Sequence, residues 1–116
     1  MQICEEMTKL RQSLTNRGIK WIDKSVIKTA DELQKLMEIM PNVDANYLDT
    51  SMYRTHFDYK GTRWSVINGY GSYGGYDPID DKNEGLLELL IGDIAGNEPI
   101  GNLTADDVLN YMETYK

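Results

Sequence analysis

His56 is the residue best suited to acid-base chemistry, because it is the only histidine of the chain and its side chain titrates near neutral pH. In the hairpin predicted below, it lies across from Ser65, with Asp58 two residues along the same strand. A histidine that takes a proton from a serine would make a hydrolase. However, the exposed G-x-S-x-G turn that presents such a serine is absent, and Ser65 falls inside a strand. We therefore predict a solvated cross-strand pair and no catalytic residue, and we keep a hydrolase based on His56 as the least favoured alternative.

The sequence contains few metal ligands. Its only cysteine is Cys4, so neither an intramolecular disulfide nor a cysteine-based zinc site can form. The acidic residues between positions 77 and 84 have the composition of a calcium loop, but they lack its alternating oxygen ligands and its central glycine. The sequence predicts no metal site and no cofactor, and it predicts a solvated acidic loop over residues 77–84.

Residues 69–78 form the most unusual stretch, because they are rich in both glycine and tyrosine. Their glycines match the G-x-G-x-x-G pattern of dinucleotide-binding domains, which depends on a helix that begins directly after it. Gly75 and Pro78 follow instead and cannot open such a helix, so we reject that interpretation. Two hypotheses stay open. Either Tyr70 and Tyr73 present rings and hydroxyls to a ligand, or the segment is a structural turn at the edge of a sheet.

Three arginines could supply fixed positive charge for phosphate groups. Arg54 and Arg63 belong to the polar face of the predicted hairpin, and Arg17 lies where the first predicted helix ends. A surface ion pair, such as one between Arg63 and Asp58, is the more frequent role for any single arginine. As a group, the three arginines indicate an anion site about as strongly as they indicate surface pairing.

The start of the last predicted helix is a second candidate anion site. Backbone amides at Thr104 and Ala105 would be free to bind an anion there. Asp106 and Asp107 follow directly and oppose a second negative charge.

The spacing of apolar residues defines the elements that must position these side chains. Helices are predicted over residues 3–14, 29–40 and 104–115, with capping boxes at the starts of the last two. Strands are predicted over residues 19–23, 52–59, 62–70, 86–91 and 100–103, with a helix as the alternative for residues 86–91. Residues 41–51 are predicted to form a loop and residues 96–99 a turn. This order predicts an α+β fold, an antiparallel sheet with flanking helices, in one small domain of residues 1–116.

The two central strands predict their own register, because a two-residue turn joins them. Pairing them through Lys60 and Gly61 sets Phe57 opposite Trp64 on one face and Asp58 opposite Arg63 on the other. One face of the hairpin is then apolar and the other charged. This agreement between register, packing and charge favours the pairing.

Composition limits the function further. The chain has 116 residues, a formal net charge of −7 and no apolar run near the ~20 residues of a membrane span. Its first ten residues lack the basic and then apolar layout of a secretory signal, so we expect a cytoplasmic protein. The negative charge repels a phosphate backbone and gives little support to nucleic-acid binding. The same charge would suit an acidic inhibitor that occludes the basic channel of a nuclease or CRISPR effector, which is our alternative function.

Several runs of the sequence resemble small proteins of phages and prophages, in particular the first family of Thoeris anti-defence sponges. These runs are Arg17-Gly18-Ile19 with Trp21, the hairpin segments Tyr53-Arg54-Thr55 and Trp64 to Gly71, and Glu98 to Gly101 with Leu103-Thr104-Ala105. The resemblance implies a protein that is not an enzyme, that binds a cyclic ADP-ribose-type signal and that withholds it from a bacterial defence effector. It also implies a homo-oligomer that can hold cyclic oligonucleotides between its subunits.

The resemblance also implies site residues at the matching positions of this chain. Arg17, Gly18, Thr104 and Ala105 would contact phosphate between subunits. The nucleotide pocket would be formed by the hairpin and its neighbours, at Trp21, Arg54, Arg63, Asn68, Tyr70 and Tyr73. The net charge of −7 departs from what an anion-binding protein is expected to carry.

Overall fold

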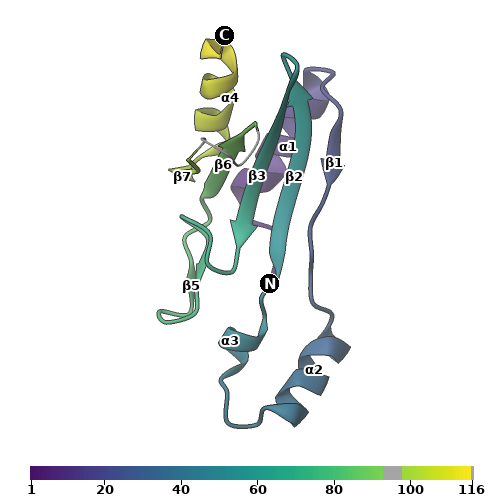
Figure 1. Ribbon diagram of the computed structural model, residues 1–116, viewed down its shortest axis with the longest axis vertical. Coiled ribbons are helices and arrows are strands. Elements are labelled where there is room, and N and C mark those ends of the chain that lie inside the picture. Colours follow the sequence, from purple (N-terminus) through teal and green to yellow (C-terminus); the bar gives the residue numbers. More distant parts are fainter. Residues whose placement is uncertain (93–97, 116) are drawn as a thin grey trace.

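The fold is α+β, as predicted, in a computed structural model that describes residues 1–92 and 98–115 (Figure 1). The helices are α1 (Glu5–Asn16), α2 (Ala30–Ile39), α3 (Ala45–Leu48) and α4 (Ala105–Thr114). The strands are β1 (Trp21–Asp23), β2 (Met52–Tyr59), β3 (Thr62–Gly69), β4 (Tyr76–Asp77), β5 (Lys82–Asn83), β6 (Leu87–Ile91) and β7 (Ile100–Leu103). Part of the turn predicted over residues 96–99 lies outside the described residues.

Five strands form one antiparallel sheet in the order β1-β2-β3-β6-β7. The predicted hairpin register is confirmed, with Phe57 opposite Trp64 and Asp58 opposite Arg63. The segment predicted over residues 86–91 is a strand and not a helix, since β6 pairs with β3 from Glu88 to Ile91. The register is specific because side chains alternate between faces, so a slip of one residue would turn the apolar set toward water.

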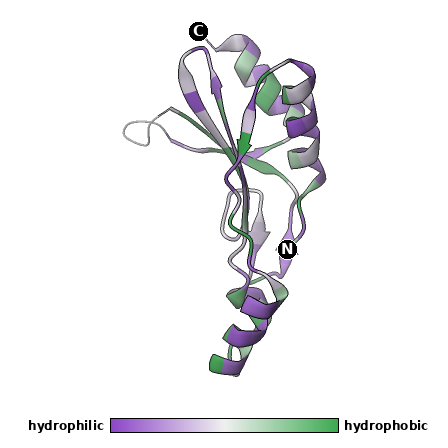
Figure 2. Cartoon of the chain, turned by 90° about the vertical axis from the view of Figure 1, so that its right-hand side faces the viewer, coloured by the Kyte–Doolittle hydropathy of each residue, from purple (hydrophilic) through white to green (hydrophobic). Residues whose placement is uncertain are grey.

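Helices α1 and α4 cover one face of this sheet (Figure 2). Trp64 is fully buried between them and the sheet, where its ring contacts those of Phe57, Tyr59 and Tyr115 at centroid distances of 5.7, 5.9 and 5.3 Å. Each large side chain buried in this way contributes roughly 1.5–3 kcal/mol to folding. The other buried apolar residues of this core are Met7, Leu10, Leu14, Val66, Leu87, Leu89, Leu103, Ala105, Val108, Leu109 and Met112.

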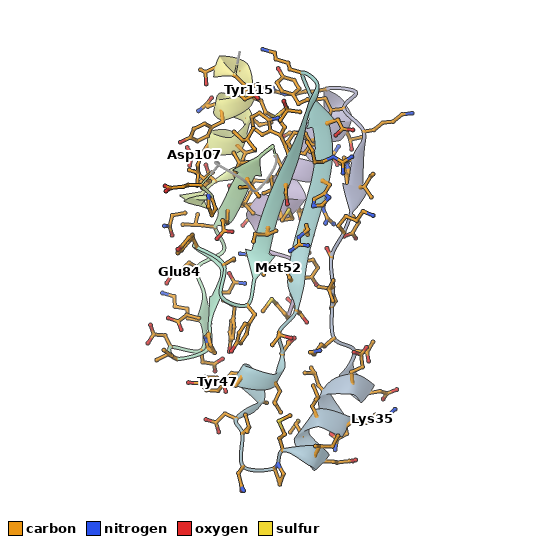
Figure 3. The ribbon with its side chains drawn as sticks, viewed as in Figure 1. Lys35, Tyr47, Met52, Glu84, Asp107 and Tyr115 are labelled. Carbon is orange, nitrogen blue, oxygen red and sulfur yellow. The ribbon has the colours of Figure 1, made fainter. Side chains whose placement is uncertain are left out.

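A helical arm formed by residues 29–50 extends below the sheet, and the molecule is 50 Å long but only 25 and 24 Å across. The prediction of a loop over residues 41–51 is wrong in part, because this segment contains α3. None of the residues of α2 is buried, although Thr29 and Glu32 form the predicted capping box at its start. Lys35 and Tyr47 mark the two helices of the arm, far from Asp107 of α4 and from Tyr115, which follows α4 (Figure 3).

Residues 69–85 fold into a compact lower corner, where β4 and β5 form a two-stranded hairpin. The predicted solvated loop over residues 77–84 is therefore partly strand. Glycine is required here by close packing, because a Cβ at Gly69 would lie 2.5 Å from the Ser51 carbonyl oxygen and one at Gly75 would lie 1.9 Å from Ser72 Oγ. The structure thus gives the glycines of this segment a structural role.

Candidate functional site

The face of the sheet opposite α1 and α4 is not covered by any helix in the described part of the chain. Because side chains alternate along each strand, the register assigns one set of residues to this open face. On β1, β2 and β3 they are Ile22, Arg54, His56, Asp58, Arg63, Ser65 and Ile67. Both hairpin arginines predicted as anion ligands therefore belong to the same face.

Positive charge is concentrated on this open face around His56. Partial burial, followed by the charges of Arg54, Arg63 and Lys24, lowers the pKa of His56 from its ordinary value. The facing carboxylate, Asp58, is held by Arg63, whose Nε donates to Oδ1 at 2.6 Å. This hydrogen bond lowers the pKa of Asp58, so the carboxylate stays ionised and offsets one of the positive charges. The excess charge around His56 is positive.

A hollow of about 890 Å³ lies at the edge strand β1, and residues from both faces of the sheet line it. Three residues predicted as ligand contacts line it, Gly18, Trp21 and Arg63, together with His56. The rest of its lining consists of Thr15, Ile19, Lys20, Ile22, Phe57 and Asp58. A ligand in this hollow would meet an indole, an imidazole and two basic side chains.

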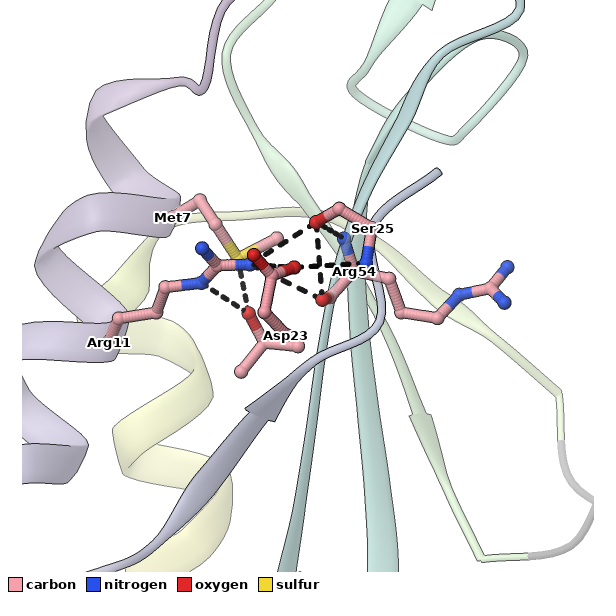
Figure 4. A network of polar contacts seen from close by, with 6 residues as sticks. Met7, Arg11, Asp23, Ser25 and Arg54 are labelled. Carbon is pink, nitrogen blue, oxygen red and sulfur yellow. Dashed lines mark hydrogen bonds and ion pairs between the residues drawn. The ribbon is translucent and has the colours of Figure 1, made fainter. Parts of the chain in front are cut away.

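Arg54 lies next to His56 on the open face and carries an unused hydrogen-bond donor. Its side chain leaves the strand on the side opposite α1 (Figure 4). Its Nε is buried and has no hydrogen-bond partner within the part of the protein that the structure describes. A buried donor without an acceptor is uncommon in native proteins, and the Trp64 Nε1 of the core shares this state. An anionic oxygen is the acceptor that the rest of the guanidinium would bind best.

Arg11 of α1 holds the edge strand in place beneath this site (Figure 4). Its Nε donates to Thr55 Oγ1 at 2.8 Å, and its Nη2 lies 3.2 Å from Asp23 Oδ1 and 3.3 Å from the Arg54 carbonyl oxygen. The guanidinium also stacks over the Trp21 ring, 4.8 Å from its centroid. Sequence reasoning missed Arg11, although a basic residue four positions after Met7 on the buried stripe of α1 was a usable signal.

The remaining predicted residues lie elsewhere. Asn68 is fully buried on the helix-covered face, and its amide donates to Asn83 and to the Leu86 carbonyl. Tyr70 and Tyr73 belong to the lower corner, where Tyr73 is 61 % exposed and packs against Gly101. The predicted set is thus divided among separate places. Gly18, Trp21 and Arg63 line one hollow, and Arg54 shares the open face with Arg63.

Arg17 lies at the end of α1 and pairs with Glu113 of α4 at 3.5 Å on the surface. The expectation of free amides at the start of α4 is wrong. Thr104 N donates to Asp107 Oδ2 at 2.9 Å, and Ala105 N donates to Glu6 Oε1 at the same distance. Side chains of the protein therefore occupy the positions that an anion would need.

Thr104→Ala tests whether the Thr104 side chain caps the start of α4. The Thr104 hydroxyl accepts from Asp107 N at 3.2 Å, and loss of such a cap costs about 1 kcal/mol. We expect that decrease in the free energy of unfolding, measured with urea, while Thr104→Ser retains most of the stability. Equal stability of the alanine and serine variants would contradict the assignment.

A second cleft, of about 970 Å³, separates the arm from the N-terminus and the β4–β5 hairpin. Asp44, Asp49 and Asp81 line it, and Asp49 binds the N-terminal ammonium at 2.9 Å. Desolvation and a hydrogen bond to Asp81 raise the pKa of Tyr76 in this cleft to about 12. None of the residues predicted to bind a ligand lines the cleft, and its charge is opposite to that of the open face.

Within residues 1–92 and 98–115 there is no group of three or more histidine, cysteine or acidic side chains that could hold a metal ion. None of the helices in these ranges combines the length and apolar character needed to cross a membrane. No protein-family model matches the chain, and neither a curated protein nor a solved structure shows significant similarity to it.

Proposed function

We propose that this protein binds a small phosphorylated nucleotide on the open face of its sheet and withholds it without cleaving it. The observation that carries the proposal is the positive cluster of Arg54, Arg63 and Lys24 around His56 in a chain of net charge −7. Two or three cations with fixed geometry are sufficient to bind a phosphate or pyrophosphate group.

The distribution of charge along the chain supports this location. Between residues 52 and 69 there are three basic residues and one acidic residue, whereas residues 76–85 of the lower corner contain one basic and four acidic residues. Much of the acidic character thus belongs to the lower corner, although Glu88 of β6 lies on the open face. A phosphorylated ligand would be repelled from those surfaces and attracted to the hairpin.

The size and lining of the β1 hollow suit a nucleotide. Its volume of about 890 Å³ falls within the usual range of small-molecule sites. Trp21 contributes an indole whose Nε1 is held by Thr15 Oγ1 at 2.9 Å, and Ile22, which follows it on the opposite face of the strand, is 50 % exposed. A base or ribose could rest on one of these two side chains while a phosphate meets Arg63, the arginine that lines the hollow.

Withholding the ligand fits the site better than cleaving it. His56 lies across from Ser65 in the register, yet no hydrogen bond joins the two side chains. The carboxylate that would orient a catalytic histidine, Asp58, is engaged by Arg63. A general base needs a nucleophile within hydrogen-bond reach and a partner that orients it, and this site provides neither.

The resemblance to Thoeris anti-defence sponges narrows the proposal to a phage protein that acts in the cytoplasm of its bacterial host. Its ligand would be a cyclic ADP-ribose isomer, and it would act as a homo-oligomer. Cyclic oligonucleotides would be additional ligands at a separate site between subunits.

The test is ligand binding by the purified full chain against a panel of cyclic ADP-ribose isomers. We expect at least one isomer to raise the Tm and to be recovered intact after heat denaturation. Arg54→Gln combined with Arg63→Gln should weaken its binding at least tenfold, because a charge-assisted contact contributes about 1.5–3 kcal/mol. Lys35→Gln, which removes one positive charge from the distant arm, is the control for either single arginine substitution and should bind normally. Recovery of a cleaved product would identify an enzyme instead.

The acidic lower corner supports one alternative, an inhibitor that occludes the basic channel of a nuclease or CRISPR effector. Asp77, Asp80, Asp81 and Glu84 gather within one short segment and are all exposed. This alternative predicts that a nuclease co-purifies with the protein and that no isomer in the panel changes the Tm.

A further inference from the structure

His56 occupies the centre of the open face. In the register it is flanked by Ile22 of β1 and Ser65 of β3, and it lines the β1 hollow together with Arg63. It is half-buried and within reach of a ligand in that hollow. A ligand whose phosphate met Arg63 there would also come close to the imidazole.

The charged groups around His56 lie on β2, β3 and β6 and directly after β1. Arg54 and Asp58 lie on β2, Arg63 on β3 and Lys24 directly after β1. On β6, the open-face neighbour of Ser65 is the apolar Leu90, and the next open-face residue is Glu88, whose carboxylate accepts from Tyr73 N. Asp58 is bound to Arg63.

These surroundings oppose a charge on the imidazole while the site is empty. The three cations repel a proton, and the two facing carboxylates already have partners. An anionic ligand reverses this balance, because its charge offsets the cations and its oxygens can accept a hydrogen bond from a protonated imidazole. The ligand and the proton therefore stabilise one another on this face.

We propose that the protein takes up a proton on His56 when it binds its phosphorylated ligand and therefore holds that ligand more tightly as the pH falls. This inference rests on the proposed function. His56 would then favour negatively charged ligands, and its contribution to their affinity would add to the attraction by the arginines. The affinity should rise by up to tenfold per pH unit between the pKa of His56 in the complex and its lower pKa in the free protein.

Calorimetric titration at pH 6.5 in two buffers of different ionisation enthalpy measures the proton directly. The ligand is the cyclic ADP-ribose isomer that raises the Tm most. We expect a net uptake of up to one proton per ligand by the wild type and a lower Kd at pH 5.5 than at pH 7.5. His56→Gln keeps a hydrogen-bonding side chain that does not titrate, and it should bind with little pH dependence. Any proton uptake by the ligand itself would also be measured with this variant, and it is subtracted from the wild-type value.

The outcomes separate the two claims. Absence of binding by the wild type at every pH overturns the proposed function and this inference together. Binding without proton uptake, or uptake that persists undiminished in His56→Gln, overturns only the role of His56. An unchanged far-UV circular dichroism spectrum and Tm of the free variant show that it is folded.

Discussion

Replacing Asn68 by aspartate should lower the free energy of unfolding by about 3–5 kcal/mol at neutral pH, the size expected when a charge is buried without a compensating cation. Asn68 is fully buried, and its Nδ2 donates to the Leu86 carbonyl at 2.9 Å and to Asn83 Oδ1 at 3.1 Å. Aspartate has no amide hydrogens, so both acceptors would face a carboxylate. Chemical denaturation with urea measures the loss.

The loss in Asn68→Asp should also depend on pH. Burial and two facing oxygens raise the pKa of the new carboxyl in the folded state above its unfolded value of about 3.9. The folded state then binds more protons than the unfolded state, so stability falls as the pH rises above about 4 and the variant is less destabilised at pH 4 than at pH 7. Asn110→Asp, on the exposed side of α4, is the matched control. A pH-independent loss below about 1 kcal/mol would contradict the buried role of Asn68.

Local patterns were sufficient to predict most of the sheet. The alternation of Thr55, Phe57, Trp64 and Val66, with a two-residue turn between the strands, allows only one register that buries all four. The capping boxes at Thr29 and Thr104 were equally predictable from the sequence, because each is formed by two residues only three positions apart.

The features that sequence analysis missed depend on contacts between distant segments. The β4–β5 hairpin has only two residues per strand and is tied to other segments by hydrogen bonds of Asn83 with Asn68 and of Pro78 with Asn46. Asn68 was predicted to bind a ligand on the strength of a resemblance, but its partners are 15 and 18 residues away. The alternation of the strand already assigned Asn68 to the face of Trp64 and Val66, and that signal was the more informative one.

The candidate site was predictable from strand alternation in part. The alternation on β2 and β3 places Arg54 and Arg63 on one face without any knowledge of the helices. The sequence could not show that this face lacks a covering helix, since α2 has an amphipathic pattern typical of a helix that packs on a sheet. In the structure α2 lies in the arm instead, and the open face results from that placement.

Arg11→Ala should destabilise the protein by about 2–4 kcal/mol and also loosen the β1 side of the site. The side chain is only 12 % exposed and links α1 to Thr55, Asp23 and the Arg54 carbonyl. Its removal leaves the buried Thr55 without its guanidinium partner and removes the cation that stacks on Trp21. Urea denaturation gives the stability, and hydrogen exchange of the β1 amides, which should become faster than that of the β3 amides, gives the local effect.

Lys9→Ala is the matched control for Arg11→Ala, because it removes a cation from the same helix two residues away. Lys9 is exposed and pairs with Glu5 and Glu6 on its own helix, so its loss should not measurably change the unfolding midpoint. If Arg11→Ala matched Lys9→Ala in both stability and β1 exchange, Arg11 would be an ordinary surface cation. The hollow beside β1 would then owe its shape to Trp21 and the strand pairing alone, because no buried cation would be needed to hold the edge strand against α1.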